Sequence, residues 1–162
     1  ARGYGIADKR RLPLALLCNI LGGPFANSIL NIELREKRGL SYNVEASYTP
    51  YSDSGIFAIY FSTDHCHSQE CVELINDQIG RICREPLSDR RLSVAKRQFI
   101  AQMAISMESN EGYMLGAGKS YLLYKDIDTL EEAYKKVMLI TAQEIRDVAN
   151  DSFAQLSQLV YK

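Results

Sequence analysis

The tripeptide His65-Cys66-His67 is the densest group of soft metal ligands in the chain. On a strand, His65 and His67 would point to the same side, as two zinc ligands can. Zinc sites need three or four protein ligands at fitting spacings, and no third ligand accompanies this group. The pattern therefore favours a polar loop that leads into a helix around Val72 over a metal site.

A second candidate, Gly116-Ala117-Gly118-Lys119-Ser120, resembles the end of a phosphate-binding loop. That loop requires a further glycine at position 113, where this chain has Tyr113, and no strand precedes it. A Ser or Cys nucleophile would have to use His65 or His67, which are neighbours in one loop. The acidic residues fall on predicted wet helix faces, so nothing marks a catalytic triad or a nucleotide site.

The segment from Leu34 to Tyr42 is different, because a dense basic turn ends a helix at Gly39 and leads directly into a strand. Arg35 and Tyr42 flank this corner. Cations near a helix carboxy terminus favour the helix dipole, and tyrosine is common at the start of a strand. A purely structural role for both residues therefore stays open at this point.

Composition indicates one ordinary globular domain spanning residues 1–162, since 46% of the 162 residues are hydrophobic and 24% are charged. With 19 basic and 20 acidic side chains, the formal charge of -1 favours neither nucleic acid nor an anionic membrane as partner. The four cysteines lack paired spacing, which favours a reducing, cytoplasmic compartment over a disulfide framework. Because the first residue is Ala1, we expect a fragment of a longer chain.

Helical periodicity predicts helices from Lys9 to Leu21, from Asn27 or Ser28 to Gly39, around Val72 to Ile82, and after a Ser88 cap. Further helices are expected after an Asn110 cap, around Leu130 to Val137, and after the capping box Thr141-Ala142-Gln143-Glu144. Between these lies a hairpin, with Val44, Ala46 and Tyr48 alternating on one strand and Ile56 to Phe61 forming an inner, antiparallel strand. A last short strand is expected from Leu156 to Tyr161. Helices grouped around a hairpin predict an α+β domain of two layers, with helices packed on a largely antiparallel sheet.

Four groups of residues, in this order, resemble the carboxy-terminal half of the pitrilysin, insulysin and mitochondrial-processing-peptidase family of zinc peptidases. They are Ile20-Leu21-Gly22-Gly23-Pro24, Asn27-Ser28, Leu34 through Tyr42, and Asp53-Ser54-Gly55. The resemblance covers nearly all of the chain, although the opening strand of the family is truncated before Tyr4. Ile29 departs from the family, in which Arg is common at that position.

In this family an amino-terminal half binds zinc through the inverted motif H-x-x-E-H, and the homologous carboxy-terminal half lacks the metal. This sequence has no H-x-x-E-H. The resemblance implies a metallohydrolase-like fold and a substrate-binding, site-completing role in a zinc metalloendopeptidase. Arg35 would hold a substrate carbonyl or carboxylate, and Tyr42 would donate to the developing oxyanion.

The same resemblance implies that zinc is held by an amino-terminal half or by a homologous subunit, that peptides are the substrates, and that this chain alone is inactive. Two alternatives stay open. The chain can be a non-catalytic homologue that serves assembly, or a subunit that lends Arg35 and Tyr42 to a separate zinc-bearing chain. An H-x-x-E-H in the amino-terminal half would favour the enzyme, and copurification with a zinc-bearing chain would favour the subunit.

Overall fold

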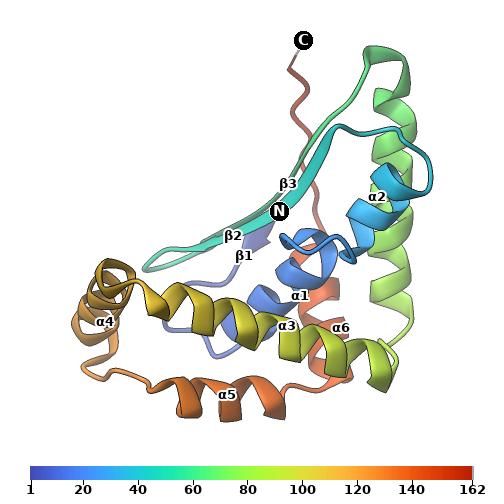
Figure 1. Cartoon of the computed structure of the whole chain (residues 1–162). Coiled ribbons are helices and arrows are strands. Elements are labelled where there is room, and N and C mark those ends of the chain that lie inside the picture. Colours follow the sequence, from blue (N-terminus) through green and yellow to red (C-terminus); the bar gives the residue numbers. More distant parts are fainter. Residues whose placement is uncertain (162) are drawn as a thin grey trace. The chain divides into compact units, whose positions relative to one another are not determined.

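The computed structural model describes residues 1–161 and divides the chain into two compact units. The sheet unit comprises Ala1–Leu87 and the residues from Ala142 onward, and the helical unit is Ser88–Thr141. The sheet unit contains β1 (Arg2–Gly3), α1 (Arg11–Gly22), η1 (Asn31–Glu36), β2 (Asn43–Pro50), β3 (Gly55–Ser62), η2 (His65–His67), α2 (Ser68–Arg84) and α6 (Ala142–Ser152) (Figure 1). The helical unit contains α3 (Asp89–Glu108), α4 (Asn110–Tyr124) and α5 (Leu130–Leu139). The α+β class is confirmed, since helices pack on a small antiparallel sheet.

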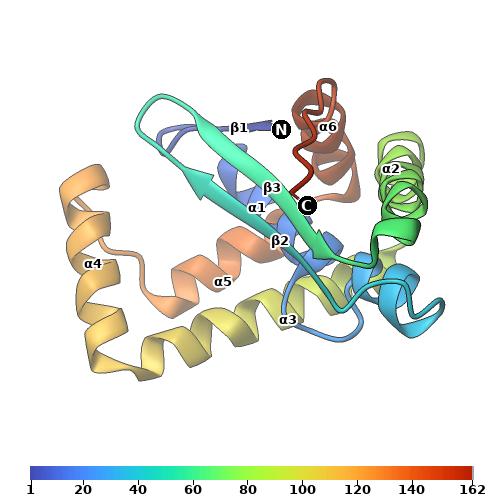
Figure 2. The same cartoon turned by 90° about the horizontal axis from the view of Figure 1, so that it is seen from above.

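The sheet has the strand order β1-β3-β2, and both neighbouring pairs are antiparallel. Val44 lies opposite Phe61 and Tyr48 opposite Phe57, so the predicted hairpin is confirmed. A turn closed by the Tyr51 N–H and the Ser54 carbonyl, 2.7 Å apart, joins its strands. The inner position predicted for the second strand is also confirmed, because β3 lies between β1 and β2 (Figure 2).

The two faces of the hairpin differ in burial. Val44 and Phe57 point to the covered face, whereas Ile56 and Tyr60 on the opposite face are exposed. Helix α1 lies beneath the sheet in Figure 2 and contacts β2. Gly22 allows this approach, since a Cβ added there would lie 2.5 Å from the Ala46 nitrogen.

The core of the sheet unit is built from apolar helix faces at the predicted spacing. Edge-to-face contact between Phe57 and Phe153, with ring centroids 5.0 Å apart, joins the sheet to the end of α6. Buried core residues include Leu14, Leu16, Leu17, Ile20 and Leu21 of α1, Ile75, Ile79 and Ile82 of α2, and Ile145, Val148 and Ala149 of α6.

The second predicted helix is present, but most of it is a π-helix. The Lys37 N–H donates to the Ile32 carbonyl at 2.9 Å, which is the wider i to i−5 bond. Gly39 then takes a left-handed conformation with φ of 63°, as the predicted helix stop requires. The π-helix itself ends at Glu36, and Gly39 closes the turn that follows it.

Helix caps in the helical unit follow the sequence with one correction. Ser88 caps α3 as predicted, its hydroxyl accepting from the Arg91 N–H at 3.4 Å. The cap of α4 is Ser109 rather than Asn110, because Ser109 has the extended backbone of a cap and accepts from the Gly112 N–H at 3.3 Å. Thr129 and Glu132 form a capping box at the start of α5.

The predicted strand from Leu156 to Tyr161 is wrong, since no strand occurs among these residues in the described part of the chain. Their side chains are exposed, Leu159 to 93%. A strand is stabilised by ladder hydrogen bonds to a neighbour, and no described strand pairs with this segment. Val160 and Tyr161 favour a strand, but this propensity forms none without a partner strand.

Candidate substrate-binding corner

The corner between η1 and β2 reverses the chain within a few residues. Beyond Arg35, the Gly39 N–H donates to the Arg35 carbonyl at 2.9 Å and the Leu40 N–H to the Leu34 carbonyl at 2.8 Å. These bonds close the end of the helical turn in the manner of a glycine C-cap. Arg35 thus precedes a stop that is held by backbone hydrogen bonds.

The far side of the corner is tied to the end of β3. The Tyr42 N–H donates to the Ser62 carbonyl at 2.9 Å, and Ser41 Oγ lies 2.6 Å from the Asn43 carbonyl oxygen and 3.0 Å from that of Ser62. Thr63 Oγ1 donates to the Leu40 carbonyl. Several hydrogen bonds therefore hold the backbone beside Tyr42 in one place.

The Tyr42 ring itself is 70% exposed, and its hydroxyl donates to Asp64 Oδ1 at 3.1 Å. This hydrogen bond, with the negative charge of Asp64, raises the pKa of Tyr42. The phenol is therefore neutral at neutral pH and keeps a proton that it can donate. Sequence reasoning missed Asp64, although the antiparallel register that pairs Asn43 with Ser62 places residues 42 and 64 near one another.

The Arg35 side chain is exposed and forms no hydrogen bond or ion pair with any residue of the described range 1–161. The nearby acid, Glu33, accepts instead from Lys37 at 2.6 Å and from Arg38 at 2.8 Å. Those hydrogen bonds lower the pKa of Glu33. Arg35 and Tyr42 are thus exposed on the two arms of one corner, and no hydrogen bond joins them.

Comparison with known proteins identifies this architecture. The sequence profile described as "Peptidase M16 inactive domain" matches residues 1–99, which include the whole corner. The chain belongs to this peptidase family. As an M16 inactive domain it confirms the resemblance found in the sequence.

Relatives of this M16 domain carry zinc-protease names. The uncharacterized zinc protease YmxG of Bacillus subtilis is 27% identical over 154 residues, which are 95% of this chain and 37% of that protein. An uncharacterized zinc protease of Rickettsia bellii is 30% identical over 143 residues, 86% of this chain and 33% of that protein. The chain therefore spans about a third of the length of these relatives.

Solved structures share the fold of the domain. The peptidase M16 inactive domain from Pseudomonas fluorescens superposes with a TM-score of 0.76 at 24% identity, covering 92% of this chain and 35% of that one. A chain of Complex III2 from Candida albicans superposes with a TM-score of 0.79 at 17% identity, covering 93% of this chain and 38% of that one. At these identities the likeness describes the fold alone.

Zinc, which the names of the relatives carry, does not fit the residues of this M16 domain. Within residues 1–161 no group of three or more His, Cys, Asp or Glu side chains could hold a metal ion. His65, Cys66 and His67 form the short 3-10 turn η2 that leads into α2, which is the loop favoured by the sequence. Gly116 to Ser120 lie inside α4, so no phosphate loop forms there.

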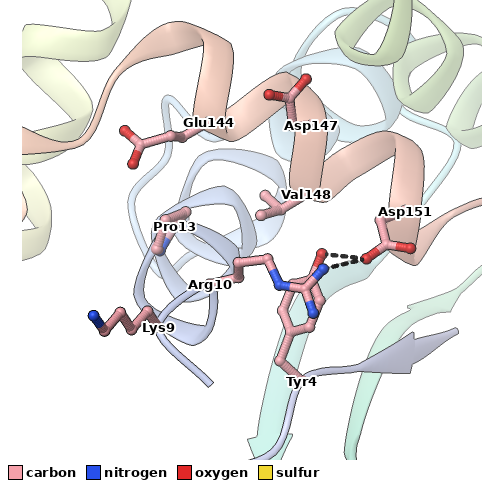
Figure 3. Close-up of a pocket in the computed structure, with 8 residues that line it drawn as sticks. All are labelled: Tyr4, Lys9, Arg10, Pro13, Glu144, Asp147, Val148 and Asp151. Atoms are coloured by element: carbon pink, nitrogen blue, oxygen red, sulfur yellow. Dashed lines mark hydrogen bonds and ion pairs between the residues drawn. The ribbon is translucent and has the colours of Figure 1, made fainter. Parts of the chain in front are cut away.

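The M16 domain also has a hollow of about 420 Å³ in the sheet unit, lined by residues around α1 and α6 (Figure 3). Asp151 accepts from the Tyr4 hydroxyl at 2.8 Å and from Arg10 Nη1 at 3.1 Å, and the Arg10 guanidinium lies 4.2 Å from the centre of the Tyr4 ring. These groups satisfy one another. The hydrogen bonds of Tyr4 and Arg10 to Asp151 therefore hold the start of the chain against α6, and the residues that line the hollow have a packing role.

Among the described residues, none of the helices is both long and apolar enough to cross a membrane.

Proposed function

We propose that residues 1–162 are the substrate-binding, site-completing domain of a zinc metallopeptidase that cleaves peptides. This role is supported by membership of the M16 inactive-domain family and by zinc-protease relatives of whose length this chain spans about a third. The metal would be bound by an amino-terminal half or by a homologous subunit, since the donor set here does not fit zinc. The chain by itself would be inactive.

The observation that carries the proposal is the uncommitted Arg35 guanidinium at a corner whose backbone is otherwise held by hydrogen bonds. Glu33 is already paired with Lys37 and Arg38, so Arg35 has its donors available. A guanidinium binds carbonyl or carboxylate oxygens through a planar fork of N–H groups. A peptide substrate presents such oxygens.

Tyr42 would act on charge that develops later in the reaction. Its single hydroxyl proton is donated to the Asp64 carboxylate, which is a stronger acceptor than a neutral peptide carbonyl. As the carbonyl becomes an oxyanion, it competes with Asp64 for that proton. The gain is then realised mainly in the transition state, as catalysis requires.

An assembly role without peptidase chemistry is the alternative, and a chain of Complex III2 from Candida albicans shares the fold. The fold does not distinguish the two roles. The Complex III2 chain superposes with a TM-score of 0.79, which is close to the 0.76 of the Pseudomonas fluorescens M16 domain. In a third role, Arg35 and Tyr42 would complete the site of a separate zinc-bearing chain. The corner would then bind the substrate in the same way. Copurification of a zinc-bearing partner would distinguish it.

The proposal is tested by peptide turnover of the full-length protein, with Tyr42→Phe and with Tyr60→Phe as the matched control. Tyr60 is also exposed, on β3. Losing one oxyanion donor should lower kcat about 100-fold with little change in KM, while Tyr60→Phe keeps wild-type turnover. Wild-type kcat in the Tyr42→Phe protein would contradict the role.

Arg35→Ala should also lower turnover, and the double variant should lose less than the product of the two single losses, since the residues act on one group. Lys37→Ala is the control for removing a cation from the same turn. Melting temperatures of all variants separate lost chemistry from lost stability. Strict additivity would indicate that the two residues act on different groups.

A further inference from the structure

The four cysteines differ in how far solvent can reach them. Cys18 and Cys71 are buried, Cys83 is half-buried and Cys66 is exposed. Burial raises the pKa of the Cys18 thiol to about 12 and also raises the pKa values of Cys71 and Cys83. Because the thiolate is the reacting form, these three thiols are expected to be slow nucleophiles.

Cys66 also has a base within reach. Its Sγ lies 3.5 Å from Nδ1 of His67, which is a hydrogen-bonding distance for sulfur. The backbone holds this pair in place, since both residues belong to η2 and the His67 N–H donates to the Asp64 carbonyl at 3.0 Å. An imidazole beside a thiol promotes formation of the thiolate.

The Cys66–His67 pair follows Asp64, the residue that binds the Tyr42 hydroxyl. Asp64, two residues before Cys66, accepts the Tyr42 hydroxyl at 3.1 Å. The Asp64 carbonyl also accepts the His67 N–H at 3.0 Å, so Asp64 is hydrogen-bonded both to Tyr42 and to the turn that contains Cys66. A group attached to Cys66 Sγ would therefore stand beside the proposed oxyanion donor.

We propose that Cys66 is a reactive thiol activated by His67, and that a mixed disulfide formed on it blocks the corner of Arg35 and Tyr42. The blocking effect rests on the proposed function, whereas the reactivity of the thiol does not. The reactant is a low-molecular-weight disulfide. Peptide turnover would thus respond to the thiol–disulfide state of the surroundings.

The chemistry is a thiol–disulfide exchange. His67 Nδ1 takes the Cys66 proton, and the thiolate attacks one sulfur of the small disulfide. A bond forms between Cys66 Sγ and that sulfur while the original S–S bond breaks, and the departing thiolate takes the proton from His67. One thiol is consumed and one is released, and dithiothreitol reverses the step.

Thiol labelling tests the reactivity without any measurement of turnover. Full-length protein is treated with 4,4′-dithiodipyridine, the released thiopyridone is followed by absorbance, and peptide mapping locates the label over time. We expect Cys66 to react at least ~10-fold faster than Cys83, as an exposed thiol with a neighbouring imidazole should. Cys66→Ser should remove the fast phase from this region.

His67→Gln should slow the Cys66 reaction several-fold. His65→Gln, in the same turn but without a contact to the sulfur, is the matched control and should leave the rate unchanged. Circular dichroism establishes that the variants are folded. Labelling of Cys83 as fast as Cys66, or an unchanged rate in His67→Gln, would overturn the reactive pair.

Peptide turnover tests the blocking effect. The singly labelled protein should lose most of its turnover and regain it with dithiothreitol, and Cys66→Ser should be active and insensitive to the disulfide. Full turnover after labelling would overturn the block. If the protein shows no turnover before labelling, this result would count against the proposed function and the blocking effect. The labelling experiment would still decide whether Cys66 is a reactive thiol.

Discussion

The sheet unit and the helical unit are stabilised in different ways. Of the largest fully buried side chains in the described residues, all except Val137 belong to the sheet unit, where helices meet strands from distant parts of the sequence. In the helical unit, α4 has no buried residue, and its apolar side chains are spread around the helix. Tyr113, Met114 and Tyr121 of this helix are all exposed.

This difference shows what an apolar residue on a helix does and does not imply. In α1 most of the apolar residues are buried. In α4 the helix is set by its serine cap and by local propensity, and the left-handed Lys125 ends it. We therefore expect long-range packing to dominate the stability of the sheet unit and local terms to dominate α4.

The largest expected effect is that of Phe57→Ala. Phe57 is 1% exposed and packs edge-to-face on Phe153, so its truncation should lower the free energy of unfolding by about 3–5 kcal/mol. Leu122→Ala in α4, at a side chain 73% exposed, should change it by no more than about 0.5 kcal/mol. Urea unfolding measures both, and equal losses would remove the contrast between the units.

The helical unit also contains a long-range contact, which a buried cation makes. Lys96 is 8% exposed, and its Nζ donates to the Met138 carbonyl at 2.8 Å, joining α3 to α5. Lys96→Met should cost about 1–3 kcal/mol, because it leaves that carbonyl without its donor. Amide hydrogen exchange in α3 and α5 measures this loss of stability. Arg97→Met, at the exposed neighbouring residue, is the control and should cause no loss.

Replacing glycine by alanine should have opposite effects on stability in the two units. Gly22→Ala places a Cβ 2.5 Å from the Ala46 nitrogen and should destabilise the sheet unit by about 1–3 kcal/mol. Gly116→Ala meets nothing within 4 Å and should stabilise α4 by about 0.5–1 kcal/mol. Thermal unfolding compares them, and a stable Gly22→Ala protein would show that α1 can move away from β2.

Tyr4→Phe should lower the free energy of unfolding by about 1 kcal/mol at neutral pH, because one hydrogen bond to Asp151 is removed. Burial, and then the hydrogen bond to Asp151, raises the pKa of Tyr4 from 10.0 to about 12. The unfolded chain releases this proton first, so the stabilisation is complete below pH 10 and is lost as pH rises toward 12.

The difference in stability between wild type and Tyr4→Phe should therefore shrink between pH 10 and 12. Tyr60→Phe, at an exposed tyrosine, is the control for general alkaline unfolding. A constant difference across this range would show that Tyr4 stays protonated equally well in the unfolded chain.

The sequence by itself determined the elements whose signals are local. Gly39 ends η1 because only glycine adopts the left-handed conformation without strain, and Ser88 starts α3 because its hydroxyl satisfies a free N–H group. Alternation and the turn after Pro50 determined the hairpin and its antiparallel direction. The residues of the corner were likewise visible as a string from Leu34 to Tyr42.

Only the tertiary structure decided which side chains lie next to the residues of the corner and bind them. Asp64 accepts the Tyr42 hydroxyl because the hairpin register brings the end of β3 beside the start of β2. The Arg35 side chain has no partner among residues 1–161, since Glu33 is bound by Lys37 and Arg38. The segment from Leu156 to Tyr161 is rich in apolar residues but has no described strand to pair with. Caps and turns depend on adjacent residues, whereas pairing and burial depend on contacts between residues far apart in the chain.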